Sequence, residues 1–175
     1  MLKATNINLT GKVLKYYVKY DKINILAMAR VKKWRKDIMN KKEEQRLVEN
    51  MTKKEKQELQ EYFIDSIDNG SFKLVKLFIQ IGVDVTQNDN IALELAVIHG
   101  YTKIVKMLID AGADVTVDEN YLISIASDNG YTEIVKMFID AGADVTANDN
   151  WAIKLAFNNG HAEVVNLLKE AGAKM

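Results

Sequence analysis

Apolar and polar positions along this chain follow a helical rhythm that is clearest in the middle of the sequence. Ile104, Val105, Leu108 and Ile109 are spaced i, i+1, i+4 and i+5, and Lys103 and Lys106 lie off this spacing. This spacing puts the four apolar side chains on one side of a helix and predicts an amphipathic helix that packs on that side. Gly112 follows, where a helix C-terminus favours a residue in the left-handed conformation.

The same block returns every 30 residues. Residues 100–116 read GYTKIVKMLIDAGADVT and residues 130–146 read GYTEIVKMFIDAGADVT, with 15 of 17 positions identical. Weaker copies cover residues 70–86 and 160–174. A fixed period in this range predicts stacked units of supersecondary structure. One such unit cannot bury its apolar faces alone, so we expect neighbouring units to stabilise each other by stacking.

A second helix pattern precedes each of these blocks. Leu93, Leu95 and Ala96 have counterparts thirty and sixty residues later, at Ile123, Ile125, Ala126, Ile153, Leu155 and Ala156. The small alanine allows adjacent helices to approach closely. Each unit is therefore predicted to be a helix, a tight turn at a glycine, and a second helix.

Asparagine stands where each of these leading helices is expected to start. We expect Asn90, Asn120 and Asn150 to be N-cap residues, because an Asn side chain can accept a hydrogen bond from an amide of the first turn. The first unit has a longer leading helix, in which Thr52 and Glu55 fit a capping box. That helix is predicted to end near residues 69–70.

The motifs L-x-L-A-x-x-x-G at 93–100 and I-V-K-M-L-I-D-A-G-A-D-V at 104–115 resemble those of ankyrin repeats, and the resemblance covers residues 61–175. It implies an all-α ankyrin-repeat solenoid of four helix pairs. The repeats would span about 53–88, 89–118, 119–148 and 149–175, after a helical N-terminal region at 1–52.

The repeats depart from the family pattern in length and in composition. The unit has 30 residues and not the usual 33, proline is absent, and the Thr-Pro-Leu-His start is replaced. We place the missing residues in the finger, the connection that runs from a second helix to the next first helix. Such short, Asp- and Asn-rich units resemble the ankyrin repeats of amoeba-infecting giant DNA viruses. The 53 Lys, Ile and Asn residues agree with an AT-rich genome.

The N-terminal region differs in charge from the repeats. Residues 1–60 contain 16 Lys or Arg and 7 Asp or Glu, whereas residues 61–175 contain 8 and 17. The boundary coincides with the start of the repeats and supports a chain of two parts. Residues 13–20 fit either a strand or a helix; helix is favoured because no partner strand is evident. Helical spacing continues over residues 23–38, and residues 41–50 favour helix.

A cluster of basic residues in this region forms a candidate basic surface: Lys32, Lys33, Arg35, Lys36, Lys41 and Lys42. Clustered Lys and Arg on one face can contact nucleic-acid phosphates, so a nucleic-acid-associated protein using residues 22–56 is the alternative function. The other interpretation is a solvated face, or a surface that faces the acidic repeats or an acidic protein. Pairing between the basic and acidic parts of two chains would give a homodimer where we otherwise expect a monomer.

The ankyrin resemblance implies a non-catalytic scaffold for protein–protein interaction. Its protein partner would dock on the concave side, formed by the fingers and the exposed faces of the first helices. Carried over position by position, the candidate partner-binding residues are Ile91, Glu94, Ile98, His99, Tyr121, Ser124, Asp128, Asn129, Trp151, Lys154, Asn158 and Asn159, with Asp68 and Asn69 in the first repeat. Tyr121 and Trp151 either anchor a partner or cover the helix start between neighbouring repeats.

No catalytic, metal or cofactor site is predicted. The chain has no cysteine, and its two histidines, His99 and His161, lie in different repeats. We expect His161 to have a structural role in its turn and His99 to lie on the surface. The acidic fingers lack the glycine and the distal glutamate of a calcium loop. The residues therefore favour a binding protein over an enzyme.

The two ends of the chain carry different signals. The N-terminus lacks the apolar region of a signal peptide, and no apolar run reaches membrane-spanning length. We therefore expect an intracellular, cytoplasmic protein with no membrane partner, in the host cytoplasm if the source is viral. At the other end Asn166, Lys169 and Glu170 fit a polar cap on the last repeat.

Overall fold

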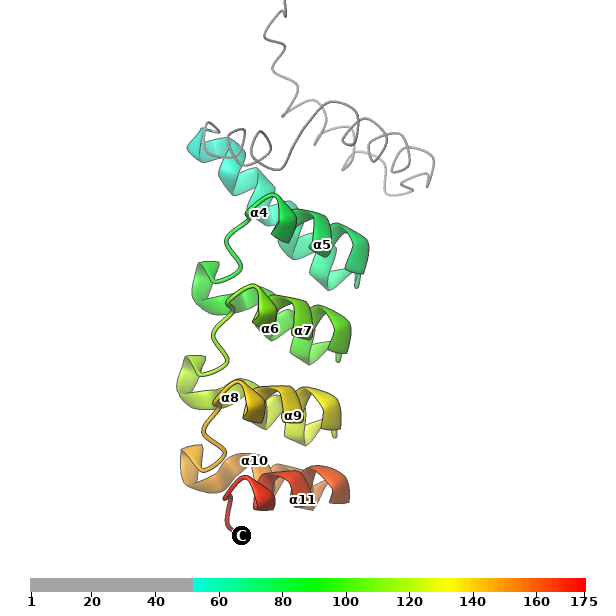
Figure 1. The fold of residues 1–175 in the computed structure, drawn as a ribbon, viewed down its shortest axis with the longest axis vertical. Coiled ribbons are helices and arrows are strands. Elements are labelled where there is room, and N and C mark those ends of the chain that lie inside the picture. Colours follow the sequence, from blue (N-terminus) through cyan, green and yellow to red (C-terminus); the bar gives the residue numbers. More distant parts are fainter. Residues whose placement is uncertain (1–51) are drawn as a thin grey trace, which may run out of the picture. The chain divides into compact units, whose positions relative to one another are not determined.

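The computed structural model describes residues 52–175. The predictions for residues 13–20, for the helices before position 52 and for the six-residue basic surface lie outside these described residues. All regular structure within residues 52–175 is helical, which confirms the all-α prediction (Figure 1). The helices are α4 Lys53–Asp68, α5 Phe72–Gln80, α6 Gln87–Ile98, α7 Thr102–Asp110, α8 Val117–Asp128, α9 Thr132–Asp140, α10 Ala147–Asn158 and α11 Ala162–Glu170.

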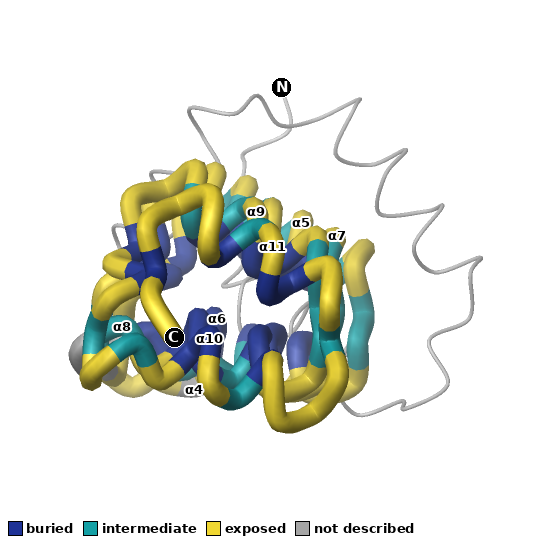
Figure 2. The backbone as a smooth tube through the Cα atoms, turned by 90° about the horizontal axis from the view of Figure 1, so that it is seen from below, coloured by how far each residue is buried: buried dark blue, intermediate teal, exposed yellow. Residues whose placement is uncertain are grey.

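The chain divides into two compact units, 1–62 with 80–83 and 63–79 with 84–175. In the second unit the helix pairs α6–α7, α8–α9 and α10–α11 form successive layers. The first helices α6, α8 and α10 stand in one row, and the second helices α7, α9 and α11 stand in the other. Figure 2 shows that the buried parts of both rows face each other. The layers therefore share one continuous core, as the 30-residue period predicts.

Buried side chains recur in register along this core. Ile104, Val105 and Leu108 of α7 are buried, as their spacing predicts, and so are their counterparts in α9 and α11. Ala96 of α6 is fully buried, and so are Ala126 and Ala156 one and two repeats later. A larger side chain at these alanine positions would have to displace its neighbours, because protein interiors are close-packed. Stacking thus explains both the apolar stripe and the repeated small residue.

The second helices end as the sequence predicts. Gly112 has φ +97°, and the amides of Gly112 and Ala113 donate to the carbonyls of Ile109 and Leu108, each at 2.9 Å. This pair of bonds is a Schellman motif, which satisfies carbonyls left open at a helix end. A residue with a side chain would pay a steric cost at this φ, whereas glycine does not.

The turn glycines meet a further constraint, because the next repeat lies against them. Gly100 has φ +67°, and a Cβ atom added to it would stand 2.7 Å from Cζ of Tyr131. The imidazole of His161 lies over Gly130 in the same way, and its Nε2 is 2.9 Å from the carbonyl oxygen of Asp128. The expected structural role of His161 is thus confirmed.

The N-cap prediction for Asn90, Asn120 and Asn150 is wrong. No side-chain cap bond is formed at the start of α6, α8 or α10, and these helices begin three residues earlier than the asparagines. The asparagines have left-handed backbone angles, with φ values of +60°, +64° and +60°. In α10 a run of three residues, 148–150, is left-handed, with φ from 50° to 60° and ψ from 41° to 49°. Asn and Asp tolerate this conformation better than other residues with a side chain.

Each of these asparagines instead bonds to the next repeat. Asn120 Oδ1 accepts a hydrogen bond of 2.8 Å from the backbone amide of Asp144, which starts the finger 24 residues later. Asn90 makes the same bond to Asp114 at 3.0 Å, and Asn150 to Lys174 at 2.7 Å. The left-handed turn therefore aims a side chain at the following finger and joins consecutive repeats.

The fingers are held by a short-range bond as well. Asp114 Oδ1 accepts from the amide of Thr116 at 2.8 Å and from its hydroxyl at 2.7 Å. Asp144 and Thr146 repeat this arrangement. The threonine hydroxyl, followed by the amide, holds the pKa of the Asp114 and Asp144 carboxyls below its ordinary value. The lowered pKa means that these bonds favour the ionised form of both carboxyls.

Within residues 52–175, one buried side-chain oxygen lacks a hydrogen-bond partner. Ser127 is fully buried in α8, at the position that Val97 occupies in α6, and its hydroxyl makes no hydrogen bond. Ser66 of α4 is buried too, but its hydroxyl donates to the carbonyl of Phe63 at 2.7 Å. Burial of a hydroxyl without a partner is unfavourable, so the two serines should contribute to stability with opposite sign.

We predict that Asn120 substitutions separate the inter-repeat bond from the backbone preference. Asn120→Gly removes the acceptor but tolerates φ +64°, and should lower the free energy of unfolding by about 1 kcal/mol. Asn120→Ala adds the strain of a left-handed alanine, about 1–2 kcal/mol more. Urea denaturation of both variants, with Asn158→Ala as an exposed control, measures these differences. Equal stability of the Gly variant and the unsubstituted chain would show that the bond contributes nothing.

A second prediction compares the two buried serines. Ser127→Ala removes an unpaired hydroxyl and should raise the free energy of unfolding by about 1 kcal/mol, whereas Ser66→Ala loses a bond and should lower it by a similar amount. Urea denaturation under identical conditions gives both values. A loss of stability in Ser127→Ala would mean that the hydroxyl has a partner after all.

Candidate partner-binding face

The first helices expose one face that points away from the second helices. On α6 this face holds positions 91, 94, 95 and 98, spaced i, i+3, i+4 and i+7, and the same positions recur on α8 and α10. We call its apolar residues the first-helix stripe. The stripe consists of Ile91, Leu95, Ile98, Tyr121, Ile125, Trp151 and Leu155.

Each of the three repeats contributes one large exposed side chain to this stripe. The exposed fraction is 45% for Ile98, 50% for Tyr121 and 47% for Trp151, and the other members of the stripe are half-buried. Packing against neighbouring repeats therefore covers only about half of Tyr121 and of Trp151. Single exposed apolar residues are ordinary, but apolar residues that recur at matching positions of stacked helices form a continuous surface.

The structure adds members to this face and removes one. Leu95, Ile125 and Leu155, which the sequence places in the first-helix pattern, are only half-buried and belong to this face. Their place four residues after Ile91, Tyr121 and Trp151, on the same side of the helix, was the available signal. Ser124 is 5% exposed, so its inclusion among the partner-binding candidates is not supported.

Several of the polar candidates bond to each other between repeats. His99 Nε2 lies 3.0 Å from Asp68 Oδ1, and its ring stacks on Tyr101 with 5.2 Å between centroids. Asn159 Nδ2 donates to the carbonyl of Asp128 at 2.9 Å and to its Oδ1 at 2.7 Å. These polar side chains join one repeat to the next, and they are exposed as well.

The corresponding pair between the second and third repeats is missing. Ile98 has no polar atom in its side chain, and Asn129 Nδ2 donates to the carbonyl of Ile125 in its own helix at 2.9 Å. Glu94 is half-buried, and the remaining candidates Lys154 and Asn158 are exposed. Ile98 therefore interrupts a polar row with an exposed apolar side chain, which extends the first-helix stripe.

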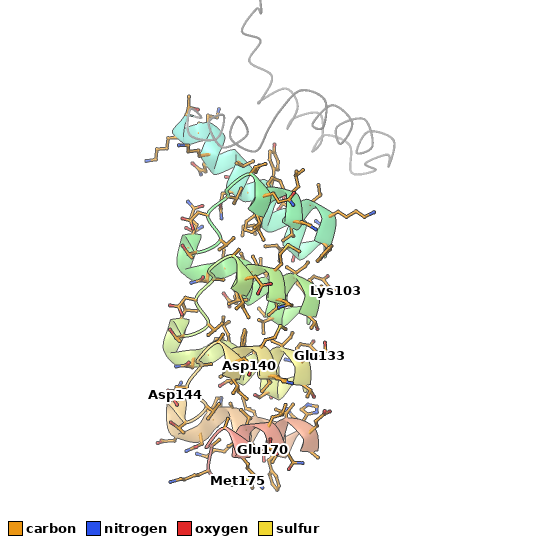
Figure 3. All side chains as sticks on the ribbon, viewed as in Figure 1. Lys103, Glu133, Asp140, Asp144, Glu170 and Met175 are labelled. Atoms are coloured by element: carbon orange, nitrogen blue, oxygen red, sulfur yellow. The ribbon has the colours of Figure 1, made fainter. Side chains whose placement is uncertain are left out.

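Negative charge is concentrated on the finger side of the repeats. The segments 84–100, 114–130 and 144–160, each a finger with its first helix, contain nine Asp or Glu residues and one lysine. The segments 101–113, 131–143 and 161–175, which hold the second helices, contain five acidic and five basic residues. Figure 3 labels Lys103 and Glu133, which stand on α7 and α9 with opposite charges. The acidic character of the repeats thus belongs to one side.

The end of the last layer is less polar than expected. Asn166, Lys169 and Glu170 of α11 are exposed, in agreement with the predicted polar cap. Phe157 of α10, however, is 57% exposed, whereas Val97 and Ser127 are fully buried at the same position in the two preceding repeats. The burial of this position evidently depends on a following repeat.

Neither a metal cluster nor a membrane-spanning helix is found among the described residues. Within 52–175, no group of three or more His, Asp or Glu side chains is arranged to hold a metal ion. The helices described there are also too short or too polar to span a bilayer. The first-helix stripe is thus the strongest candidate site in this part of the chain.

Comparison with known families agrees with this architecture. A family model for ankyrin repeats in three copies matches residues 40–119, and a model for a single ankyrin repeat matches residues 118–150. A search of curated proteins found no match to the sequence, so no relative supports the resemblance to giant-virus repeats. The two family matches together take in more than half of the chain and contain most of the stacked helices. The chain belongs to the ankyrin-repeat family.

Proposed function

We propose that this protein is a non-catalytic scaffold that binds a protein partner through the first-helix stripe. Ankyrin repeats are generally protein–protein interaction modules without enzymatic activity. The observation that carries the proposal is the recurrence of one large, half-exposed apolar side chain in each of three stacked repeats. Exposed residues of this face that make no bond between repeats remain available to a partner.

The chemistry of the stripe suits an interface. Tyrosine and tryptophan are enriched among the residues that contribute most to binding, because they bury a large area and lose little conformational entropy. Tyr121 and Trp151 occupy the same position in consecutive repeats, directly after the left-handed turn. Their helices are fixed by the shared core and by the asparagine bonds between repeats. A preformed face of this kind binds without first having to order itself.

The alternative function stays a prediction. It rests on the basic surface of the N-terminal region, which lies outside the described residues. The finger side of the repeats is negatively charged and would repel phosphates. Binding of nucleic acid would therefore depend on the N-terminal region and not on the first-helix stripe.

The proposal is tested by removal of the two aromatic side chains. Tyr121→Ala with Trp151→Ala should reduce the amount of partner captured from a cell extract at least tenfold, because two central anchors are lost. The matched control, Lys103→Ala with Glu133→Ala, changes two exposed residues of the second helices and should leave capture unchanged. Circular dichroism and urea denaturation confirm that both variants are folded. Undiminished capture by the aromatic variant would overturn the proposal.

A further inference from the structure

The charge around the first-helix stripe indicates what kind of partner segment it accepts. We infer that the stripe binds a basic amphipathic α-helix, with apolar side chains along one face and Lys or Arg along its flanks. This inference rests on the proposed function and adds the chemistry of the partner to it.

The expected positive charge of the partner follows from the uneven distribution of acidic residues between the first-helix and second-helix sides of the repeats. The three segments formed by fingers and first helices carry nine acidic residues against one lysine, whereas the segments with the second helices are balanced at five and five. A partner attracted by the field of the whole protein therefore approaches the finger side with its basic groups first. A neutral or acidic segment would gain nothing from this asymmetry.

Individual acidic groups are placed to act on such a partner. Asp149 is exposed in the left-handed turn two residues before Trp151. Asp114 and Asp144 are exposed in the fingers, and their bonds to threonine hold the carboxylates in place. Exposed charges of this kind steer a partner more than they add affinity. Lys154 is the one basic residue in these segments and is exposed on α10.

The spacing of the large apolar residues fits a helical partner. Packed helices lie about 8–10 Å apart, so Ile91, Tyr121 and Trp151, at the same position of three successive first helices, form a row with a repeat of that order. A helix that runs along the row presents residues i, i+7 and i+14 every ~10.5 Å, because each residue adds about 1.5 Å. Such a helix also satisfies its own backbone hydrogen bonds. An extended segment could not, since the described repeats contain no strand edge that would pair with it.

Fluorescence of Trp151 reports directly on occupancy. In the full-length Trp34→Phe chain Trp151 is the remaining tryptophan. The probe is a synthetic lysine-rich helical peptide with leucines at i, i+4, i+7, i+11 and i+14. Binding of this peptide should shift the Trp151 emission to shorter wavelength. The peptide should bind at least tenfold more tightly than a scrambled peptide or a peptide with Glu in place of Lys. Raising the salt concentration should weaken binding of the basic peptide several-fold, because exposed charges are screened.

A gain of affinity gives the sharpest test, since a misfolded variant cannot produce it. Lys154→Glu adds negative charge beside Trp151 and should tighten binding of the basic peptide roughly three- to tenfold at low salt. Lys136→Glu makes the same change on α9, among the second helices, and should leave the affinity unchanged. Asp149→Asn should weaken binding, whereas Asp140→Asn, its control at the end of α9, should not.

Two outcomes would overturn the inference. One is equal binding of the basic, scrambled and acidic peptides; the other is an equal response to Lys154→Glu and Lys136→Glu. The proposed function would stand after either result if Tyr121→Ala with Trp151→Ala still reduced capture of the partner. Conversely, if Tyr121→Ala with Trp151→Ala left both capture and peptide binding intact, the proposed function itself would fail.

Discussion

Consecutive repeats of this protein are joined by a hydrogen bond between an asparagine side chain and the backbone amide that lies 24 residues later. Asn90, Asn120 and Asn150 all make it, and all three have left-handed backbone angles. The left-handed turn directs each asparagine side chain to the following finger in a unit of only 30 residues. The finger is short, yet its amide is satisfied and its position is fixed by the preceding repeat.

The two sides of the first helices have different roles in the stacked repeats. One side packs against the second helices and neighbouring layers through small and branched residues such as Ala96 and Ile123. The other side is only partly buried, and there the repeats differ from each other. Its large apolar residues vary from Ile91 to Tyr121 to Trp151, while the buried alanine of the first helices is the same in all three repeats. The near-identity of 100–116 and 130–146 thus reflects the requirements of packing, and the binding chemistry lies in the residues that break the repeat.

The period and the helical spacing were sufficient to predict the architecture, because both follow from local geometry. Gly112 and Gly100 occupy the left-handed turns where the sequence placed them. The role of Asn120 was not predictable in this way, since an N-cap and a left-handed turn favour the same residue and only the contact with the next repeat separates them. The burial of Ser124 was not predictable either, because Glu94 and Lys154 at the same position are half-buried and exposed.

The central claim is that a partner docks on the first-helix face and leaves the second helices free. Nuclear magnetic resonance of the ¹⁵N-labelled full-length chain, with and without the basic helical peptide, tests where binding occurs. We predict that the largest chemical-shift changes fall on the Trp151 indole and on amides of α8 and α10, with little change in α9 and α11. Changes concentrated on α9 and α11, with the Trp151 indole unaffected, would contradict the account.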